Sequence, residues 1–187
     1  MALTTLDPKT ALVIIDLQKG IVALPAVHPT SEVVARSVKL LDAFRERNLP
    51  VVLVNVAGGA PGRSEQSRST GDFPADFAQL VPELKQQPTD HLVTKRTWGA
   101  FTNTDLDAWL RAQGVTQVVF AGVATSIGVE STARFAQELG FNITFAVDAM
   151  TDLNADAHTN SITRIFPRLG ETGTTQDILD LLDRTHA

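Results

Sequence analysis

The feature that most constrains the fold is the alternation of short apolar runs with longer segments whose apolar residues recur at helical spacing. The runs are residues 11–15, 50–56, 91–95, 117–121 and 142–147, with a short last strand expected at 171–174. The helical segments are 31–47, 102–113, 129–139, 152–166 and 174–184. Apolar runs rich in β-branched residues are typical of strands covered on both faces. Strands that alternate with helices form βαβ units, so the sequence predicts an α/β fold with a parallel sheet.

Composition limits the classes of function. The 187 residues suit one domain, spanning 1–187, with a sizeable core. A net charge of −5 argues against a nucleic-acid surface. No apolar stretch approaches the roughly 20 residues that span a bilayer, so we expect no membrane partner. Asp7 and Lys9 precede the first apolar run, which is unlike a secretory signal.

The chain contains no cysteine, which excludes disulfides, thiolate metal sites and thiol catalysis within it. This composition fits a reducing compartment, and we expect a cytoplasmic location. The four histidines are His28, His91, His158 and His186, and their spacing is not that of metal ligands. We therefore expect no metal and no cofactor, and we expect His158 to be a structural hydrogen-bonding residue on a helix.

Chemically capable residues follow three of the expected strands. Asp16 ends the first run, Lys95 ends the third, and the turn 122–128 follows the fourth. The carboxyl ends of strands in an open parallel sheet form the edge that binds ligands. Asp16 could instead cap its own loop, and Lys95 could be a solvated charge. If Lys95 is buried it needs a carboxylate partner, for which Asp16 is the candidate.

The stretch 121–133 reads as a strand end, a tight turn and a helix start. The first turn of a helix carries unpaired N–H groups and the positive end of its dipole, which suit an anion or an oxyanion. Gly128 falls in this turn. It indicates either a close approach to a ligand site or a neighbouring helix that leaves no room for a side chain.

Two further segments are candidates for shaping a site. The long polar segment 57–72 is either a lid or partner contact, or a loop without a role. The segment 73–86 is expected to form a short helix interrupted near Pro82. Trp98, Phe101 and Ile127 could form an apolar wall, although aromatic residues beside a strand end commonly belong to the core.

Several pieces of the chain together resemble one family. They are Ile15-Asp-Leu-Gln18, Lys95-Arg-Thr-Trp-Gly-Ala-Phe101, and Gly122-Val-Ala-Thr125 followed by Gly128-Val-Glu-Ser-Thr132. Asp148-Ala149 and His158 fall at similar places. In this order the pieces resemble the isochorismatase-like (cysteine hydrolase) superfamily, and the resemblance spans nearly the whole chain.

The resemblance implies a Rossmann-like three-layer sandwich around a six-stranded, mostly parallel sheet. It implies that Asp16 and Lys95 are catalytic, that a cis peptide precedes Ala124, and that backbone amides near Ala124 and Gly128 form an oxyanion hole. Gln18 and Thr125 lie within the matching pieces and are candidate substrate-binding residues. It also implies a homo-oligomer in which the 57–72 loop contributes to a neighbour's pocket.

One departure from the family is decisive for the chemistry. Most members place a nucleophilic cysteine where this chain has Gly128, so a thioester route is excluded here. Ser126 and Ser131 have no evident histidine partner, which disfavours a serine nucleophile. The true isochorismatases also resemble this chain in carrying glycine, and they cleave a vinyl ether with an Asp as general acid. The metal-dependent branch carries an Asp-x-His pair where this chain has residues 55–59 without one, so no metal is predicted.

Two functional hypotheses follow. The first is a hydrolase that acts on a small molecule without covalent catalysis, in which Asp16 either protonates an acid-labile ether or activates a water. Burial would raise the pKa of Asp16 and Lys95 would lower it, so the sequence leaves the acid and base roles open. The alternative is a catalytically silent member that binds a small molecule.

Overall fold

A computed structural model describes residues 3–65 and 73–186 of the chain. Its centre is a six-stranded sheet in the order β3-β2-β1-β4-β5-β6, and all five pairings are parallel. The strands are β1 (Thr10–Ile15), β2 (Val51–Val56), β3 (His91–Lys95), β4 (Gln117–Val123), β5 (Asn142–Thr151) and β6 (Glu171–Gly173). The predicted α/β class and parallel sheet are confirmed.

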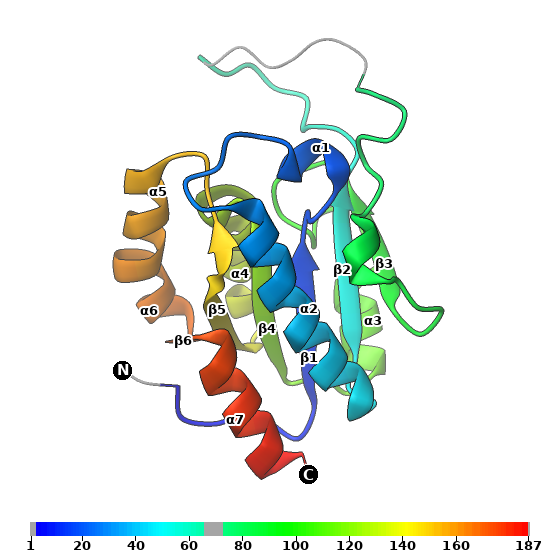
Figure 1. Cartoon of the computed structure of the whole chain (residues 1–187), viewed down its shortest axis with the longest axis vertical. Helices are drawn as coiled ribbons and strands as arrows, with labels where there is room; N and C mark the ends of the chain where they lie inside the picture. The colour runs from blue at the N-terminus through cyan, green and yellow to red at the C-terminus, as the bar shows by residue number, and fades with distance from the viewer. Residues whose placement is uncertain (1–2, 66–72, 187) are drawn as a thin grey trace.

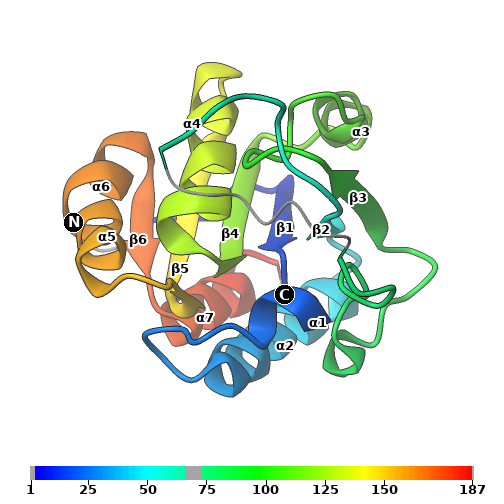
Figure 2. The same cartoon turned by 90° about the horizontal axis from the view of Figure 1, so that it is seen from above.

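Helices cover both faces of the sheet (Figure 1). They are α1 (Lys19–Val22), α2 (Thr30–Glu46), α3 (Leu106–Ala112), α4 (Glu130–Glu138), α5 (Ala155–Asn160), α6 (Phe166–Leu169) and α7 (Thr175–Thr185). Figure 2 shows α2 and α7 on one side of the sheet and α3 and α4 on the other. This three-layer arrangement is the Rossmann-like sandwich that the resemblance implies.

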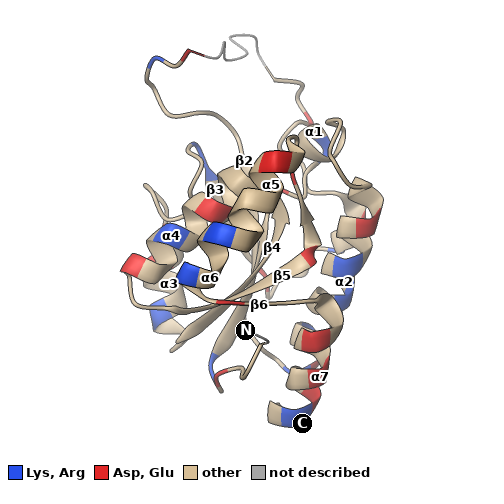
Figure 3. Ribbon diagram, turned by 90° about the vertical axis from the view of Figure 1, so that its left-hand side faces the viewer, with Lys and Arg blue, Asp and Glu red and all other residues tan. Residues whose placement is uncertain are grey.

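The two cores follow from the alternation of side chains along the strands. In β1, Leu12 and Ile14 pack with the buried faces of α2 and α7, whereas Val13 and Ile15 pack with those of α3 and α4. Every residue of β1 is buried, as a strand covered on both faces requires. Charged residues of both signs lie on the outer surfaces of α2 and α7 (Figure 3). Within the described residues, no helix is long and apolar enough to cross a membrane.

Several elements differ from the sequence-based expectations. The helix expected at 73–86 is wrong: the segment forms turns and only a short 3₁₀ helix, η1 (Pro82–Leu84). Helix α3 begins later than Thr102, and its first residue follows Asp105, whose side chain makes no capping bond. Strand β5 does not end at Asp148 but continues to Thr151. A π-helix, η2 (Thr125–Val129), precedes α4, and a second, η3 (Ser161–Ile165), separates α5 from α6.

The carboxyl ends of β1, β3 and β4 lie at one edge of the sheet, the upper edge in Figure 1. At that edge Gly122 has a φ of +118°, and a Cβ there would collide with the backbone of Ile15. Glycine is therefore required where β4 passes the end of β1. This tight pairing places the turn that follows β4 directly beside the residue that follows β1.

Candidate active site

The first pair of the site is a buried carboxylate and a buried ammonium. Asp16 directly follows β1, has a φ of 53°, and is 5% exposed. Lys95 is the last residue of β3 and is 2% exposed. Lys95 Nζ donates to Asp16 Oδ2 at 2.7 Å and to the Thr97 carbonyl at 3.3 Å. Since β2 lies between β1 and β3, the lysine side chain crosses the end of β2 to reach its partner.

The environment of Asp16 makes its neutral form more accessible than in an ordinary aspartate. Burial raises the pKa of Asp16 to about 6, and this effect outweighs the lowering by the charge and hydrogen bond of Lys95. Among the described residues, Asp16 Oδ1 has no hydrogen-bond partner. A buried polar atom without a partner is unusual and is available to a ligand or a water molecule.

The turn after β4 forms the second part of the site. The peptide bond between Val123 and Ala124 is cis. The Ala124 carbonyl accepts from the N–H groups of Ile127 and Val129, which closes the first turn of η2. π-Helical turns occur frequently at functional sites. This geometry brings Gly128 against the Asp16 side chain.

The neighbours of Gly128 decide between the two interpretations of this glycine. A Cβ at Gly128 would lie 3.0 Å from Ile15 Cγ2 and 3.2 Å from Asp16 Oδ2. These are contacts to the end of β1 and to the carboxylate. The glycine therefore allows the backbone of η2 to approach Asp16, and a neighbouring helix is not the reason for it.

Thr125 anchors η2 to the end of β5. Its hydroxyl donates to the Thr151 carbonyl at 3.0 Å and lies 2.8 Å from His158 Nδ1. Because the hydroxyl hydrogen is used, His158 Nδ1 must be the donor in the second bond. Burial and the nearby His28 lower the pKa of His158, against the opposing effect of Asp152. His158 is thus a hydrogen-bonding residue on a helix, as expected.

A cavity of about 250 Å³ opens beside the pair. It is lined by Asp16, Lys95 and Thr97, by the predicted Trp98, Ala124, Ile127 and Gly128, and by Ile21, Leu24, Val56, Gly58, Phe73, Phe77, Val123 and Leu153. The structure therefore brings together Asp16, Lys95 and the turn 123–128 around one cavity. Most of the remaining lining is apolar.

Three predicted residues do not line this cavity. Gln18 is buried, and its carboxamide bonds to the N–H and carbonyl of Val56 and to the Phe77 carbonyl. Thr125 faces Thr151 and His158, as described above. Phe101 packs against the core, where its ring centroid lies 6.3 Å from that of Phe141. The apolar wall expected of Phe101 is corrected accordingly, and Gln18 and Thr125 support the site from outside.

The sequence reasoning missed the aromatic residues of the segment 73–77. The rings of Phe73 and Phe77 stack with centroids 4.1 Å apart, and both line the cavity. A Cβ at Gly20 would collide with the Phe77 ring, so this glycine provides the seat for the ring. The contact between α1 and the segment 73–77 joins residues far apart in the sequence, so no local pattern predicts it. The glycine at position 20 is the one sequence feature that relates to this contact.

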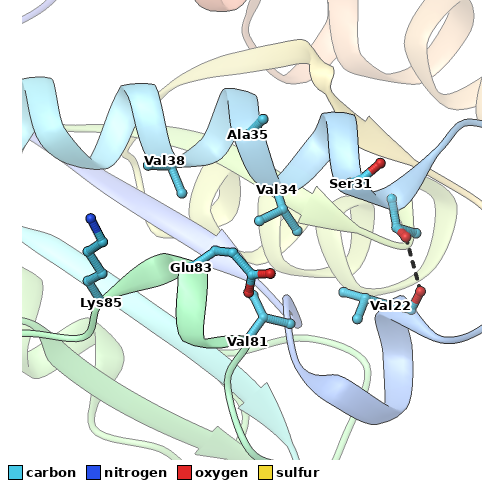
Figure 4. A pocket seen from close by; sticks show the side chains of 9 residues that line it. Val22, Ser31, Val34, Ala35, Val38, Val81, Glu83 and Lys85 are labelled. Carbon is cyan, nitrogen blue, oxygen red and sulfur yellow. Dashed lines mark hydrogen bonds between the residues drawn. The ribbon is translucent and has the colours of Figure 1, made fainter.

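A larger groove of about 680 Å³ lies between α2 and η1 (Figure 4). It is lined by Val22, Thr30, Ser31, Val34, Ala35, Val38, Val81, Glu83 and Lys85. Its charged side chains, Glu83 and Lys85, come from exposed positions on one short segment. The smaller cavity is the better candidate, because it alone of the two holds a buried acid–base pair.

Metal ligands are not gathered in the part of the chain that the structure describes. No group of three or more histidine, aspartate or glutamate residues there could hold a metal ion. At the end of β2, in the segment that was compared with the Asp-x-His pair of the metal-dependent branch, Asn55 donates to the Ala78 carbonyl. The loop expected at 57–72 lies partly outside the described residues, which end at 65 and resume at 73.

Comparison with known proteins identifies the family. Residues 10–177 match the Isochorismatase domain family. The chain belongs to the isochorismatase family. The family-level resemblance read from the sequence is confirmed, together with its Rossmann-like fold.

The relatives include both uncharacterised proteins and a hydrolase. The uncharacterised isochorismatase family protein YwoC of Bacillus subtilis is 46% identical over 179 residues, which cover 92% of this chain and 93% of YwoC. The ureidoacrylate amidohydrolase RutB of Agrobacterium fabrum is 32% identical, with 81% of this chain and 80% of RutB covered. An isochorismatase family protein of Burkholderia thailandensis has a solved structure with a TM-score of 0.92 and 43% identity, covering 96% of this chain and 98% of that one. Hydrolysis is therefore the class of reaction that the family supports.

Proposed function

We propose that this isochorismatase-family chain hydrolyses a small molecule by acid catalysis at Asp16, with a vinyl ether as the substrate class. The observation that carries the proposal is a buried carboxyl group with a pKa of about 6, one of whose oxygens has no hydrogen-bond partner among the described residues. The residue against it is a glycine, which carries no nucleophilic side chain. A pKa of about 6 leaves roughly a tenth of the group protonated at pH 7, about a hundredfold more than an ordinary aspartate. A proton donor is thereby available near neutral pH.

The proposed reaction needs one proton donor and one water. The Asp16 carboxyl group gives its proton to the terminal carbon of the C=C bond, and the ether-bearing carbon becomes an oxocarbenium ion. A water adds to that carbon and loses a proton, which returns to Asp16. The hemiketal then breaks its C–O bond and yields a ketone and an alcohol. No thioester is involved, since the chain has no cysteine.

The other residues have supporting roles in this proposal. Lys95 holds Asp16 in place and stabilises the carboxylate that forms when the proton is given away. Backbone amides near Ala124 and Gly128 would face negative charge on a substrate oxygen. Trp98 and Ile127 would contact the substrate body, since both line the cavity.

Two alternatives share the same cavity. Asp16 could act as a base on water, and the relation to RutB makes amides the substrates to test for that role. A silent binding protein is the other alternative, and the missing nucleophile is what favours it. A screen of vinyl ethers and simple amides, with product detection and ligand-induced thermal stabilisation, separates the three. Stabilisation without product would favour the silent protein.

The decisive variant is Asp16→Asn, which keeps the shape of the side chain but cannot donate an acidic proton. We expect kcat/KM for the vinyl ether to fall by about 10²–10⁴-fold, the usual contribution of a general acid. Asp107→Asn, on the surface of α3 where Asp107 pairs with Arg111, is the matched control and should retain activity. An Asp16→Asn enzyme that keeps wild-type turnover would remove the proposal.

A further inference from the structure

The charge of the cavity limits what it can bind. Among the described lining residues, Asp16 and Lys95 are the only ionisable side chains, and Thr97 carries the only hydroxyl. Arg96 is close by, beside Gly58, but it is exposed and its guanidinium donates to the Ala57 carbonyl. The described lining therefore offers a ligand one cationic side chain, that of Lys95.

That single positive charge balances a single negative charge. In the resting site the partner is the Asp16 carboxylate. When Asp16 is protonated, as the proposed reaction requires, Lys95 is free to balance one carboxylate of a substrate. A second carboxylate would find no second cationic side chain in the described lining to balance its charge, and the burial of an unbalanced charge is strongly unfavourable.

The rest of the cavity suits an apolar body. Phe77, seated on Gly20 and stacked against Phe73, forms one wall. Leu24 and Leu153 line the cavity and are partly exposed, 39% and 45%, which places apolar side chains where a charged substrate tail would emerge. The volume of about 250 Å³ corresponds to roughly eight water molecules in the liquid, which indicates a small ligand.

We propose that the cavity takes a small substrate with an apolar body and no more than one negative charge, and that it rejects dianions. This inference rests on the proposed function for its reaction, but the charge limit follows from the described lining residues alone. It assigns specificity to the absence of a second cationic side chain from the described lining residues, which include Leu24 and Leu153 at the mouth.

The first test compares vinyl ethers that differ in charge. The probes are 2-methoxypropene (neutral), 2-methoxyacrylate (one carboxylate) and 2-methoxyfumarate (two carboxylates), each rate being divided by that in dilute acid to remove intrinsic reactivity. We expect kcat/KM for the first two to agree within about tenfold and that for the dianion to be at least about 100-fold lower. A dianion that is cleaved as efficiently as the monoanion would overturn the inference.

The second test adds a cation at the mouth. Leu153→Lys should raise the ratio of kcat/KM for the dianion to kcat/KM for the neutral ether by about tenfold. Leu92→Lys makes the same change at a similarly exposed leucine, 43% against 45%, that does not line the cavity, and it should leave the selectivity unchanged. Equal effects of the two variants, or no gain in Leu153→Lys, would contradict the assignment.

Binding separates this inference from the proposed function. If no vinyl ether is cleaved, the reaction is wrong, yet the saturated pair 2-methoxypropionate and 2-methoxysuccinate still tests the charge limit by titration calorimetry. The monoanion should bind at least about tenfold more tightly than the dianion. Tighter binding of the dianion would sink the inference, whatever the fate of the reaction.

Discussion

At the scale of single residues, Gly128 sets the distance between the turn and the acid. The contacts that a Cβ would make, 3.0 Å to Ile15 Cγ2 and 3.2 Å to Asp16 Oδ2, are tighter than ordinary packing. The carboxyl group is held on its other side by Lys95 at 2.7 Å, so it cannot yield without losing that bond. The absence of a side chain at 128 is thus part of how Asp16 is oriented.

The variant Gly128→Ala tests this reading. We expect kcat/KM to fall by about 10–100-fold, because the added methyl group displaces the Asp16 carboxyl group from its position. Stability should change by less than about 1 kcal/mol, because alanine's better helix propensity offsets part of the crowding. Gly62→Ala is the control, since a Cβ there has no neighbour within 4 Å. Undiminished activity in Gly128→Ala would show that the close approach has no catalytic consequence.

The pH dependence of activity tests the role of Lys95. Because the proposed reaction needs protonated Asp16, kcat/KM should fall as pH rises through about 6. Lys95 lowers the pKa of Asp16, so its removal in Lys95→Met should raise that pKa further and extend activity to higher pH. Lys39→Met, an exposed lysine of α2, is the control.

The direction in which kcat/KM changes with pH decides whether Asp16 acts as an acid or as a base. A wild-type profile that rises with pH would assign Asp16 the role of a base. A profile that moves to lower pH in Lys95→Met would contradict the effect of Lys95 on the pKa of Asp16. An unchanged profile would show that the two groups do not interact in the working enzyme.

The acid–base pair could be predicted from sequence, whereas its surroundings could not. Asp16 and Lys95 each follow an apolar run, and parallel strands bring such positions to one edge. Phe73 and Phe77 lie in a loop whose course depends on contacts with Gly20 and Gln18, so no local pattern marks them. Phe101 was misplaced for the same reason: adjacency to Lys95 in sequence does not fix the direction of a side chain after a strand ends.

At the scale of elements, η2 is held in place by its first residue. The Thr125 hydroxyl joins η2 to the last residue of β5 and to His158. Asp152, just beyond β5, adds a second tie by accepting the Ser126 N–H at 2.7 Å. The position of Ala124 and Gly128 therefore depends on the far end of β5.

The variant Thr125→Val removes the hydroxyl and keeps the shape. We expect a loss of about 1–3 kcal/mol in the free energy of unfolding, because the His158 N–H and the Thr151 carbonyl lose a buried partner. Thr163→Val, whose exposed hydroxyl in η3 donates to the Thr159 carbonyl at the end of α5, should cost a few tenths of a kcal/mol. Urea denaturation of both variants measures the difference. Equal losses in the free energy of unfolding would show that the hydrogen bonds of Thr125 stabilise the fold no more than those of an exposed threonine.

The elements that sequence reasoning got wrong are those in which tertiary contacts override local preference. The apolar residues of 73–86 recur at helical spacing, but Pro82 and the bonds from Gln18 and Asn55 to the Phe77 and Ala78 carbonyls fix an irregular course. The π-helical form of η2 appears in the bond from the Val129 N–H to the Ala124 carbonyl, five residues earlier. Neither feature leaves a periodic signal in the sequence.

At the scale of the whole molecule, the order of strands creates the site. With β1 at the centre, between β2 and β4, the residue after it can meet both the turn after β4 and the lysine from β3. The alternation of strands and helices predicts a parallel sheet, but it does not give the order of the strands in it. The sequence therefore predicts which residues are candidates for catalysis, and the order of the strands brings their side chains together.

The outer surface bears on assembly, which we propose is homo-oligomeric. Trp98 and Phe135 are large apolar side chains that are 64% and 44% exposed. Gly99 lies next to Phe135, with the Phe135 ring 3.5 Å from the position of a Cβ, so the two exposed aromatics belong to one surface region. Exposed apolar surface of this kind marks contact sites between proteins. A second copy of the chain that covers this region would also lie at the mouth of the cavity, where Trp98 is found.

Mass measurement by light scattering after gel filtration tests the assembly. The wild type should elute at a multiple of the 20.1 kDa chain mass, and Phe135→Glu should shift it towards the monomer, because a carboxylate would be buried in the apolar contact. Leu92→Glu places the same charge on a comparably exposed leucine of β3 and should not change the mass. If the region around Trp98 is the interface, Phe135→Glu should also raise KM, since the cavity mouth would lose its cover. A wild-type chain that stays monomeric at micromolar concentration would refute the assembly and leave Trp98 as a wall residue open to solvent.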